Sequence, residues 1–349
     1  MTRHPAVFTA FCCLALMSAA ARAQEPAGSV SGIVSGRVLE IGDLTWTEID
    51  ALSRDSTLFL LAVGMLEEHG PHLPIASDQI GVEHETAEVA LRLSRALPGW
   101  SVVLMPTVPY GSAGANHVGG RPVHPGTYGI RQSTLRVLVA DIGGQIAQNR
   151  FRWIFVMSGH AAPTHGIALN EACDFISEAF GVTMANVTAL FRADSSMQRR
   201  GAYMASRHFS QSDLASFGRD VHAGVAETSG LLAIRPDLVR PVYRTLPSLA
   251  ARTFEEMRAI AQQPGWQGYF SAPARATAPF GRDIEEWWIA GMTDVILRLV
   301  RGESMAGRPR YPGELARDPR APLVEEILSH EREFERKLEQ WLADREESE

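Results

Sequence analysis

Residues 58–74 read LFLLAVGMLEEHGPHLP, and this stretch decides the fold. Its first six residues are apolar without interruption and end at Gly64, which is typical of a short strand buried on both faces. Beyond the loop, residues 79–97 place apolar side chains at helical spacing and predict an amphipathic helix. Parallel or mixed sheets covered by helices are built from such strand and helix pairs, so the sequence predicts an α/β protein.

The same alternation of strands and helices continues along the chain. Further strands are predicted at 101–106, 152–157 and 182–190, and a helix from 125 to about 148. Residues 191–218 are less regular and contain many Arg, Ser and Met residues, so we expect a surface loop or lid there. The first and third of the predicted strands end directly before histidine-rich loops. Because ligands of open α/β sheets bind beyond the carboxyl ends of strands, we expect the functional site at that edge.

The composition fits a globular protein and argues against nucleic-acid binding. Of the 349 residues, 45% are hydrophobic and 21% are charged. The formal net charge is −7, and no cluster of Lys and Arg offers a surface for a phosphate backbone. We therefore expect a small-molecule substrate and further copies of the chain as partners, rather than DNA or RNA.

The N-terminus has the pattern of an export signal. A short basic start precedes an apolar run over residues 6–20, which is shorter than a membrane span requires. The triplet Ala-Arg-Ala at 21–23 matches the small-x-small pattern that signal peptidase cuts. We predict a signal peptide over residues 1–23, a mature start at Gln24 and a periplasmic or secreted location. The alternative is an uncleaved membrane anchor.

Three parts are expected after the signal peptide. Residues 24–38 form a flexible mature N-terminus, and residues 39–301 form one domain that contains the predicted sheet. Residues 302–349 form a C-terminal extension with a charged amphipathic helix, because apolar residues recur at steps of three and four from Leu323 onward. We expect this helix to pack on the same domain, and a subunit contact is the alternative.

The cysteines carry no predicted chemistry. Cys12 and Cys13 lie in the predicted signal peptide, so the mature chain keeps only Cys173. An intramolecular disulfide is then excluded, and the apolar neighbours of Cys173 predict a small core residue.

The loop after the first strand has the side chains of a metal site. Glu67, His69 and Asp78 combine carboxylate oxygens with imidazole nitrogen, a set that suits zinc, manganese or iron. In an extended backbone Glu67 and His69 point to the same side, because side-chain direction alternates with period two. Gly70 and two prolines give a rigid loop that can bring Asp78 back to the same place. The alternative is a solvated loop with incidental acids.

Two later motifs carry further candidate residues. His160 follows the strand at 152–157 on a small-residue turn, where a structural histidine is the alternative. His222 and Glu227 stand five residues apart among small residues; Glu227 can complete a two-metal ligand set, and His222 can carry a proton near neutral pH. Asp220 is expected to orient the His222 imidazole. The alternative for this motif is an ordinary helix start.

Together the three motifs resemble those of the creatininase (creatinine amidohydrolase) family. The family has a Glu-Gln-His-Gly-x-His-Leu-Pro loop followed by an Asp, which matches Glu67 to Pro74 with Asp78. Its Gly-His turn matches Gly159-His160. Its His-Ala-Gly segment, followed by Glu-Thr-Ser, matches His222 to Gly224 and Glu227 to Ser229. The resemblance covers about residues 40–300. It implies a three-layer α/β/α sandwich around a central, mostly parallel sheet, and a homo-oligomer, often a hexamer.

The resemblance also implies the roles of single residues. Glu67, His69, Asp78 and His160 are expected to bind metal, with Asp78 bridging two divalent ions of Zn, Mn or Fe. Glu227 is expected to be the remaining ligand, or an acid close to the second ion.

Three positions depart from the family pattern. Glu68 stands where the family usually has Gln, and Val225 replaces a common acid. Ala162 stands where creatininase has a metal-binding Glu, so the second ion must rely on Glu227 or be held more weakly. These departures argue against creatinine as the substrate.

The sequence thus predicts a metal-dependent amidohydrolase that cleaves the C–N bond of a small amide, cyclic or open-chain, with activated water. His222 and Glu227 are its candidate catalytic residues, and the turn after Gly159 is expected to offer backbone donors to the oxyanion. One alternative is a metal- or ligand-binding protein of the same fold with impaired catalysis. Another is a serine hydrolase using Ser158 or Ser229, although no Gly-x-Ser-x-Gly motif surrounds either serine.

Overall fold

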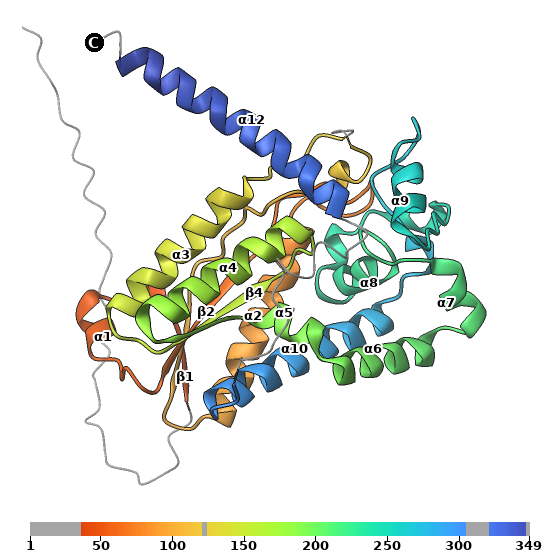
Figure 1. The fold of residues 1–349 in the computed structure, drawn as a ribbon. Coiled ribbons are helices and arrows are strands. Elements are labelled where there is room, and N and C mark those ends of the chain that lie inside the picture. The colour runs from red at the N-terminus through yellow and green to blue at the C-terminus, as the bar shows by residue number, and fades with distance from the viewer. Residues whose placement is uncertain (1–35, 121–123, 305–320, 347–349) are drawn as a thin grey trace, which may run out of the picture. The chain divides into compact units, whose positions relative to one another are not determined.

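A five-stranded parallel sheet forms the centre of the protein (Figure 1). The structure is a computed structural model that describes residues 36–120, 124–304 and 321–346. The strands are β1 (Arg37–Glu40), β2 (Thr57–Val63), β3 (Ser101–Leu104), β4 (Trp153–Ser158) and β5 (Thr183–Asn186). Their order is β1-β3-β2-β4-β5, and every pairing is parallel. The two strands that precede the histidine-rich loops, β2 and β4, are therefore neighbours.

Helices cover both faces of the sheet, because the central strand is apolar on both. Along β2, Leu58 and Leu60 pack in one core cluster and Phe59 and Leu61 in another, as the period-two alternation of a strand requires. The first cluster is closed by α2 (Ser77–Ala96) and α10 (Ala278–Val300), and the second by α3 (Gln132–Gln148) and α4 (Pro163–Phe180). The prediction of a three-layer α/β/α sandwich is confirmed, and Cys173 lies buried in the second cluster, unpaired.

Some element boundaries differ from the predictions. Strand β1 begins at Arg37 and pairs with β3, so it includes the last two residues of the segment predicted to be flexible, 24–38. The predicted strand 182–190 ends at Asn186, whose side chain accepts a hydrogen bond from the N–H of Ala189 and starts α5 (Val187–Ala193). The helix predicted from residue 125 begins only at Gln132. Residues 124–131 instead run beside the functional site.

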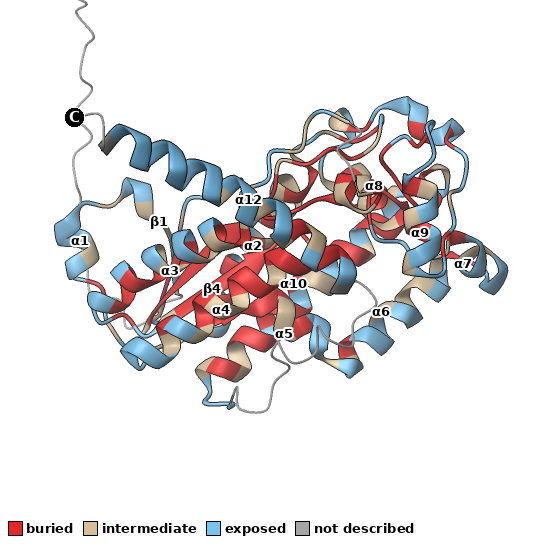
Figure 2. Cartoon of the chain, turned by 45° about the horizontal axis from the view of Figure 1, so that its top comes forward, coloured by how far each residue is buried: buried red, intermediate tan, exposed pale blue. Residues whose placement is uncertain are grey.

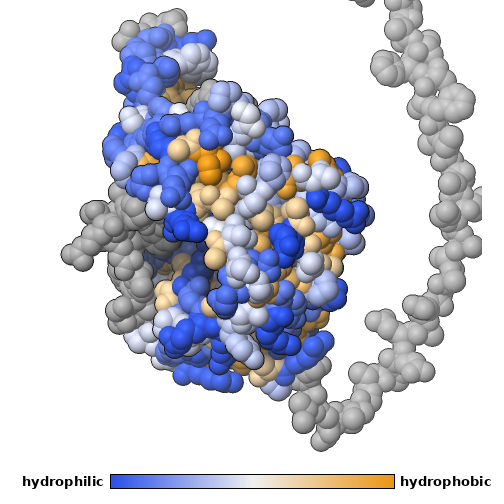
Figure 3. Space-filling model, turned by 90° about the vertical axis from the view of Figure 1, so that its right-hand side faces the viewer, coloured by the Kyte–Doolittle hydropathy of each residue, from blue (hydrophilic) through white to orange (hydrophobic). Residues whose placement is uncertain are grey.

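The prediction of an irregular loop over residues 191–218 was wrong. This segment forms the end of α5 and then α6 (Ser195–His208) and α7 (Gln211–Phe217), which begin at capping residues Asp194 and Ser210. Its many polar side chains are the exposed faces of short helices, which hide the apolar pattern. Figure 3 shows the side of the molecule that carries α7, where hydrophilic surface surrounds smaller hydrophobic patches.

The remaining elements are short except for the last helix. They are α1 (Trp46–Asp50), α8 (Val225–Ile234), α9 (Phe254–Ala261), α12 (Ala321–Glu346) and the 3-10 helices Ile41–Asp43, Ala115–His117, Pro236–Leu238, Pro241–Thr245 and Pro273–Arg275. Figure 2 shows buried residues concentrated in the sheet and on the inner helix faces, whereas most of α12 is exposed. Among the described helices, none combines the length and apolar character that a membrane span requires. The predicted signal peptide lies outside the described residues.

Candidate metal centre

Six predicted site residues converge beyond the carboxyl ends of β2 and β4. Glu67 and His69 lie in the loop after β2, Asp78 is the second residue of α2, and His160 follows β4. His222 lies in the turn before α8, and Glu227 is the third residue of that helix. Glu67 and His69 are each 1% exposed and Asp78, His160 and His222 are also buried, whereas the Glu227 side chain is 39% exposed. The site is therefore a buried cluster that can be approached from the side of α8.

A glycine allows the two halves of the cluster to meet. A Cβ atom on Gly159 would lie 2.3 Å from the carbonyl oxygen of Asp78, so only glycine fits between the end of β4 and the start of α2. This close approach places Nδ1 of His160 3.0 Å from Oδ2 of Asp78.

Asp78 lies between two histidines and faces each with a different oxygen. Its Oδ1 is 3.2 Å from Nε2 of His69, while its Oδ2 contacts His160. Nδ1 of His160 is 3.1 Å from Oε2 of Glu67, and Nε2 of His69 is 3.5 Å from Oε2 of Glu227. Three sets of potential ligand atoms, each within 4.8 Å, result: Glu67, Asp78 and His160; His69, Asp78 and Glu227; Glu67, His69 and His222. Asp78 belongs to two of them.

Unpartnered polar atoms show that the cluster suits a cation. Nε2 of His160 and Nε2 of His222 are buried without a hydrogen-bond partner. Nε2 of His69 and Oε2 of Glu67 have charged neighbours at 3.2 and 3.1 Å but make no well-directed hydrogen bond. Buried polar atoms nearly always have a partner, because an unmet one costs about 1–3 kcal/mol. Carboxylate and imidazole are the ligands that divalent transition metals prefer, so the residues present fit such an ion.

The buried acids and histidines of the cluster shift one another's pKa values. Burial would raise the pKa of Glu67, but His222 and His160 outweigh burial and lower that pKa to about 2. Burial likewise opposes the charge on His160, yet Glu67 and Asp78 raise its pKa to about 10. Burial also lowers the pKa of His69, but Asp78 outweighs burial and raises that pKa well above its usual value. A cation that binds here must displace protons from these imidazoles, since only the neutral ring is a ligand.

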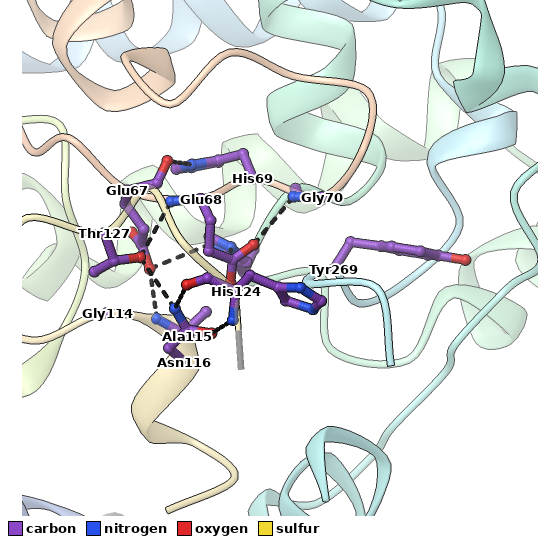
Figure 4. A network of polar contacts seen from close by, with 12 residues as sticks. Glu67, Glu68, His69, Gly70, Gly114, Ala115, Asn116, His124, Thr127 and Tyr269 are labelled. Atoms are coloured by element: carbon purple, nitrogen blue, oxygen red, sulfur yellow. Dashed lines mark hydrogen bonds and ion pairs between the residues drawn. The ribbon is translucent and has the colours of Figure 1, made fainter. Parts of the chain in front are cut away.

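A backbone donor that sequence reasoning missed orients Glu67 (Figure 4). The N–H of Ala115 donates to Oε1 of Glu67, and a Cβ atom on Gly114 would lie 2.9 Å from the same oxygen. Thr127 accepts a hydrogen bond from the N–H of Glu68 at 3.2 Å. A backbone N–H leaves no mark on the sequence.

Glu68, which replaces the usual Gln, faces the cluster with one oxygen. Its Oε1 is buried, has no hydrogen-bond partner and lies 3.8 Å from Nε2 of His222, while Oε2 accepts from the N–H of Gly70 at 3.2 Å. The His222 ring also lies 4.3 Å from that of His69, centroid to centroid. His222 can therefore serve either as a ligand or as a proton carrier.

The expectation that Asp220 orients His222 was wrong. Its carboxylate accepts hydrogen bonds from the N–H groups of Val225 and Ala226, both at 2.8 Å, which are the first two of α8. Free N–H groups at a helix start attract a carboxylate more strongly than a distant imidazole does. Asp220 thus fixes the helix that carries Glu227.

We expect Asp220→Ala to destabilise the protein by about 1 kcal/mol, the usual cost of losing a helix cap. The free energy of unfolding from urea titration measures this, with Asp213→Ala as the matched control, since Asp213 accepts a hydrogen bond from the N–H of Ser210 at the start of the peripheral helix α7. Asp220→Ala should also weaken metal binding, because Glu227 follows two residues after the capped N–H of Val225. Unchanged metal binding would show that the cap does not position Glu227.

The geometry argues against a serine hydrolase. The N–H of Ser112 donates to Nδ1 of His165, so the proton of that ring lies on Nε2, 3.1 Å from Oγ of Ser158. Ser158 therefore receives a hydrogen bond from the histidine and donates its own to the carbonyl of His160. Ser229 is fully buried and accepts from the N–H of Thr277. Neither serine has a histidine placed to take its proton.

The expected backbone donors after Gly159 are already occupied. The N–H of Gly159 donates to the carbonyl of Val63, and that of His160 to Oγ of Ser158. The prediction that this turn stabilises an oxyanion was therefore wrong for these two groups.

The family model described as "Creatininase: Creatinine amidohydrolase" matches residues 42–296, which is more than half of the chain. The chain belongs to the creatininase family. It is therefore an amidohydrolase of this family and has the fold of a metal-dependent hydrolase, as the three motifs predicted.

Relatives within the creatininase family differ in what their names say they act on. The chain is 29% identical over 279 residues to a mycofactocin precursor peptide peptidase of Mycobacterium ulcerans, which covers 76% of this chain and 93% of the relative. It is also 29% identical over 276 residues to the creatinine amidohydrolase of Pseudomonas putida, with 73% and 95% covered. Family membership alone does not select the substrate.

Solved creatininase structures share the fold. A creatinine amidohydrolase (creatininase) is 25% identical, with a TM-score of 0.53, and covers 76% of this chain and 98% of its own. A structure described as "Creatininase Mn" gives the same identity and TM-score and covers 76% and 99%.

Proposed function

We propose that this chain hydrolyses the C–N bond of a small amide, cyclic or open-chain, with water activated by two divalent cations. The observation that carries the proposal is the position of Asp78. Its two oxygens face two histidines, and it is the residue that the set containing His160 and the set containing Glu227 have in common. A carboxylate placed in this way is suited to bridge two ions.

The chain's own side chains define two binding positions. Glu67, Asp78 and His160 would hold one ion, and His69, Asp78 and Glu227 the other. When bound, such cations polarise a carbonyl group and lower the pKa of a water molecule. Glu227 would supply the carboxylate that Ala162 lacks, and its partial exposure is consistent with a position that substrate can reach.

His222 is the residue that we propose to carry the proton to the leaving nitrogen. Burial opposes its charge, but Glu67 raises its pKa above the usual value, which favours the protonated ring. Glu68 lies beside Nε2 and can keep the ring oriented while the proton moves. The negative charge of Glu68 favours the protonated ring of His222. An uncharged Gln at the same position would not.

The enclosure of the site supports a small substrate. The ligand atoms come from side chains that are at most 9% exposed, except Glu227. A small amide or the end of a short peptide can reach them, whereas the interior of a folded chain cannot. We propose the small amide, because His222 and Glu68 leave little room beside the metal positions.

The proposal is tested by removing and restoring the metal. We expect protein treated with a chelator to lose hydrolysis of a panel of small cyclic and open-chain amides, and to regain it with Zn²⁺ or Mn²⁺. The same panel should include short peptides, which would reveal the activity named for the mycobacterial relative.

Two other outcomes are informative. Tight binding of Zn²⁺ or Mn²⁺ without turnover of any amide or peptide would favour the impaired binding protein. Turnover that persists with chelator would contradict metal chemistry altogether.

Export and self-association extend this proposal. We propose that the signal-like residues 1–23 direct the protein to the periplasm or outside the cell, and that it forms a homo-oligomer. Cell fractionation and light scattering of the purified mature protein measure these two properties.

A further inference from the structure

The C-terminal helix α12 lies beyond the matched family segment, yet it contacts a turn beside the metal centre. Leu323 and Ile327 of α12 are 5% and 4% exposed, and they form an apolar cluster with Ala113. Ala162, two residues after His160, packs against the same cluster. The buried part of α12 therefore covers one wall of the site, while its second half extends past α3 (Figure 1).

The contacted turn has a strained backbone. Ala113 has a φ of 63°, in the left-handed region that residues other than glycine seldom occupy. Such a conformation persists only where the surrounding structure holds it. Two residues later, the N–H of Ala115 donates to Glu67. The strained residue thus sets the direction of a donor that orients a proposed metal ligand.

Polar contacts fix α12 on both sides of this turn. Both carboxylate oxygens of Glu331 accept from the N–H of Gln132, at 3.0 and 2.9 Å, and Oε1 is 3.5 Å from Oγ of Ser112. Glu326 forms an ion pair with Arg258 at 3.1 Å. The helix is therefore held in register with the segment that contains Ala113.

We infer that α12 is a positioning element of the metal centre: Leu323 and Ile327 hold Ala113 in its strained conformation, so that Ala115 orients Glu67. The inference rests on the proposed function, in which Glu67 is a ligand. It predicts that α12 supports the ion held by Glu67, Asp78 and His160. None of the contacts described for His69, Asp78 and Glu227 reaches Ala113, so an ion bound by these three residues should be much less dependent on α12.

The test uses the full chain with the double substitution Leu323→Ala and Ile327→Ala. Calorimetric titration of metal-free protein with Mn²⁺ should show one binding step weakened by about tenfold to a hundredfold, the range for residues that orient metal ligands. The other step should change by less than about threefold. Leu338→Ala, on the exposed half of the same helix, is the matched control and should leave both steps unchanged.

A third substitution separates positioning from general loosening. Glycine adopts positive φ without strain, so adding Ala113→Gly to the double variant should recover much of the lost affinity. Equal affinity of the double variant and the unmodified protein would overturn the inference, as would equal weakening of both steps or a further loss with Ala113→Gly. If the unmodified protein binds no Mn²⁺ or Zn²⁺, the proposed function fails instead.

Discussion

Asp78→Ala is expected to abolish hydrolysis and to leave the protein without a stable pair of cations. Asp78 is shared by two ligand sets, so its loss removes one ligand from each ion and the link between them. Metal affinity should fall by more than about a hundredfold, which exceeds the usual effect of changing a residue that only orients a ligand. Elemental analysis of purified protein, with kcat for the best amide of the panel, measures both losses.

The control for this variant lies on the same helix. Glu83→Ala removes an exposed carboxylate of α2 that bonds only to Gln79 among the described contacts, and it should keep metal and activity. Two ions in the unmodified protein and about one in Asp78→Ala would mean that Asp78 binds one ion without bridging. Full metal content in Asp78→Ala would remove the basis of the proposed site.

His222→Ala is expected to lower kcat by about a hundredfold to ten-thousandfold, the usual cost of losing a general acid or base. Because we assign proton transfer and not ligation to His222, the variant should retain its cations. The loss should be smaller for amides whose leaving amine is a weak base, since these need less help from a proton donor. Kinetics with a series of leaving groups and elemental analysis of the same preparation test this.

The metal content decides between the two roles of His222. His222 also forms a ligand set with Glu67 and His69, so a ligand role predicts that an ion is lost along with activity. The matched control is His208→Ala, because His208 pairs with Asp283 of α10, belongs to none of the three ligand sets and should affect neither property. An unchanged kcat in His222→Ala would exclude it as the proton carrier.

Local patterns were enough to predict the central elements and the chemistry of the loops. The apolar run 58–63 identified β2 because this strand is buried on both faces, and the acids and histidines after it identified a metal site by ligand type. The short strand β1 was not predicted, because its burial pattern is mixed. The helices α6 and α7 were not predicted, because their exposed polar faces dominate the sequence.

The sequence by itself determined which residue types stand at the ends of β2 and β4, and therefore that the site has the ligand types of a candidate metal centre. Only the tertiary structure decided which atoms meet. It made β2 and β4 neighbours, and it brought Gly159 close to Asp78. It also directed Asp220 to the start of α8 and the N–H of Ala115 to Glu67. Such contacts arise from packing and from backbone hydrogen bonds, which leave no periodic pattern in the residues that make them.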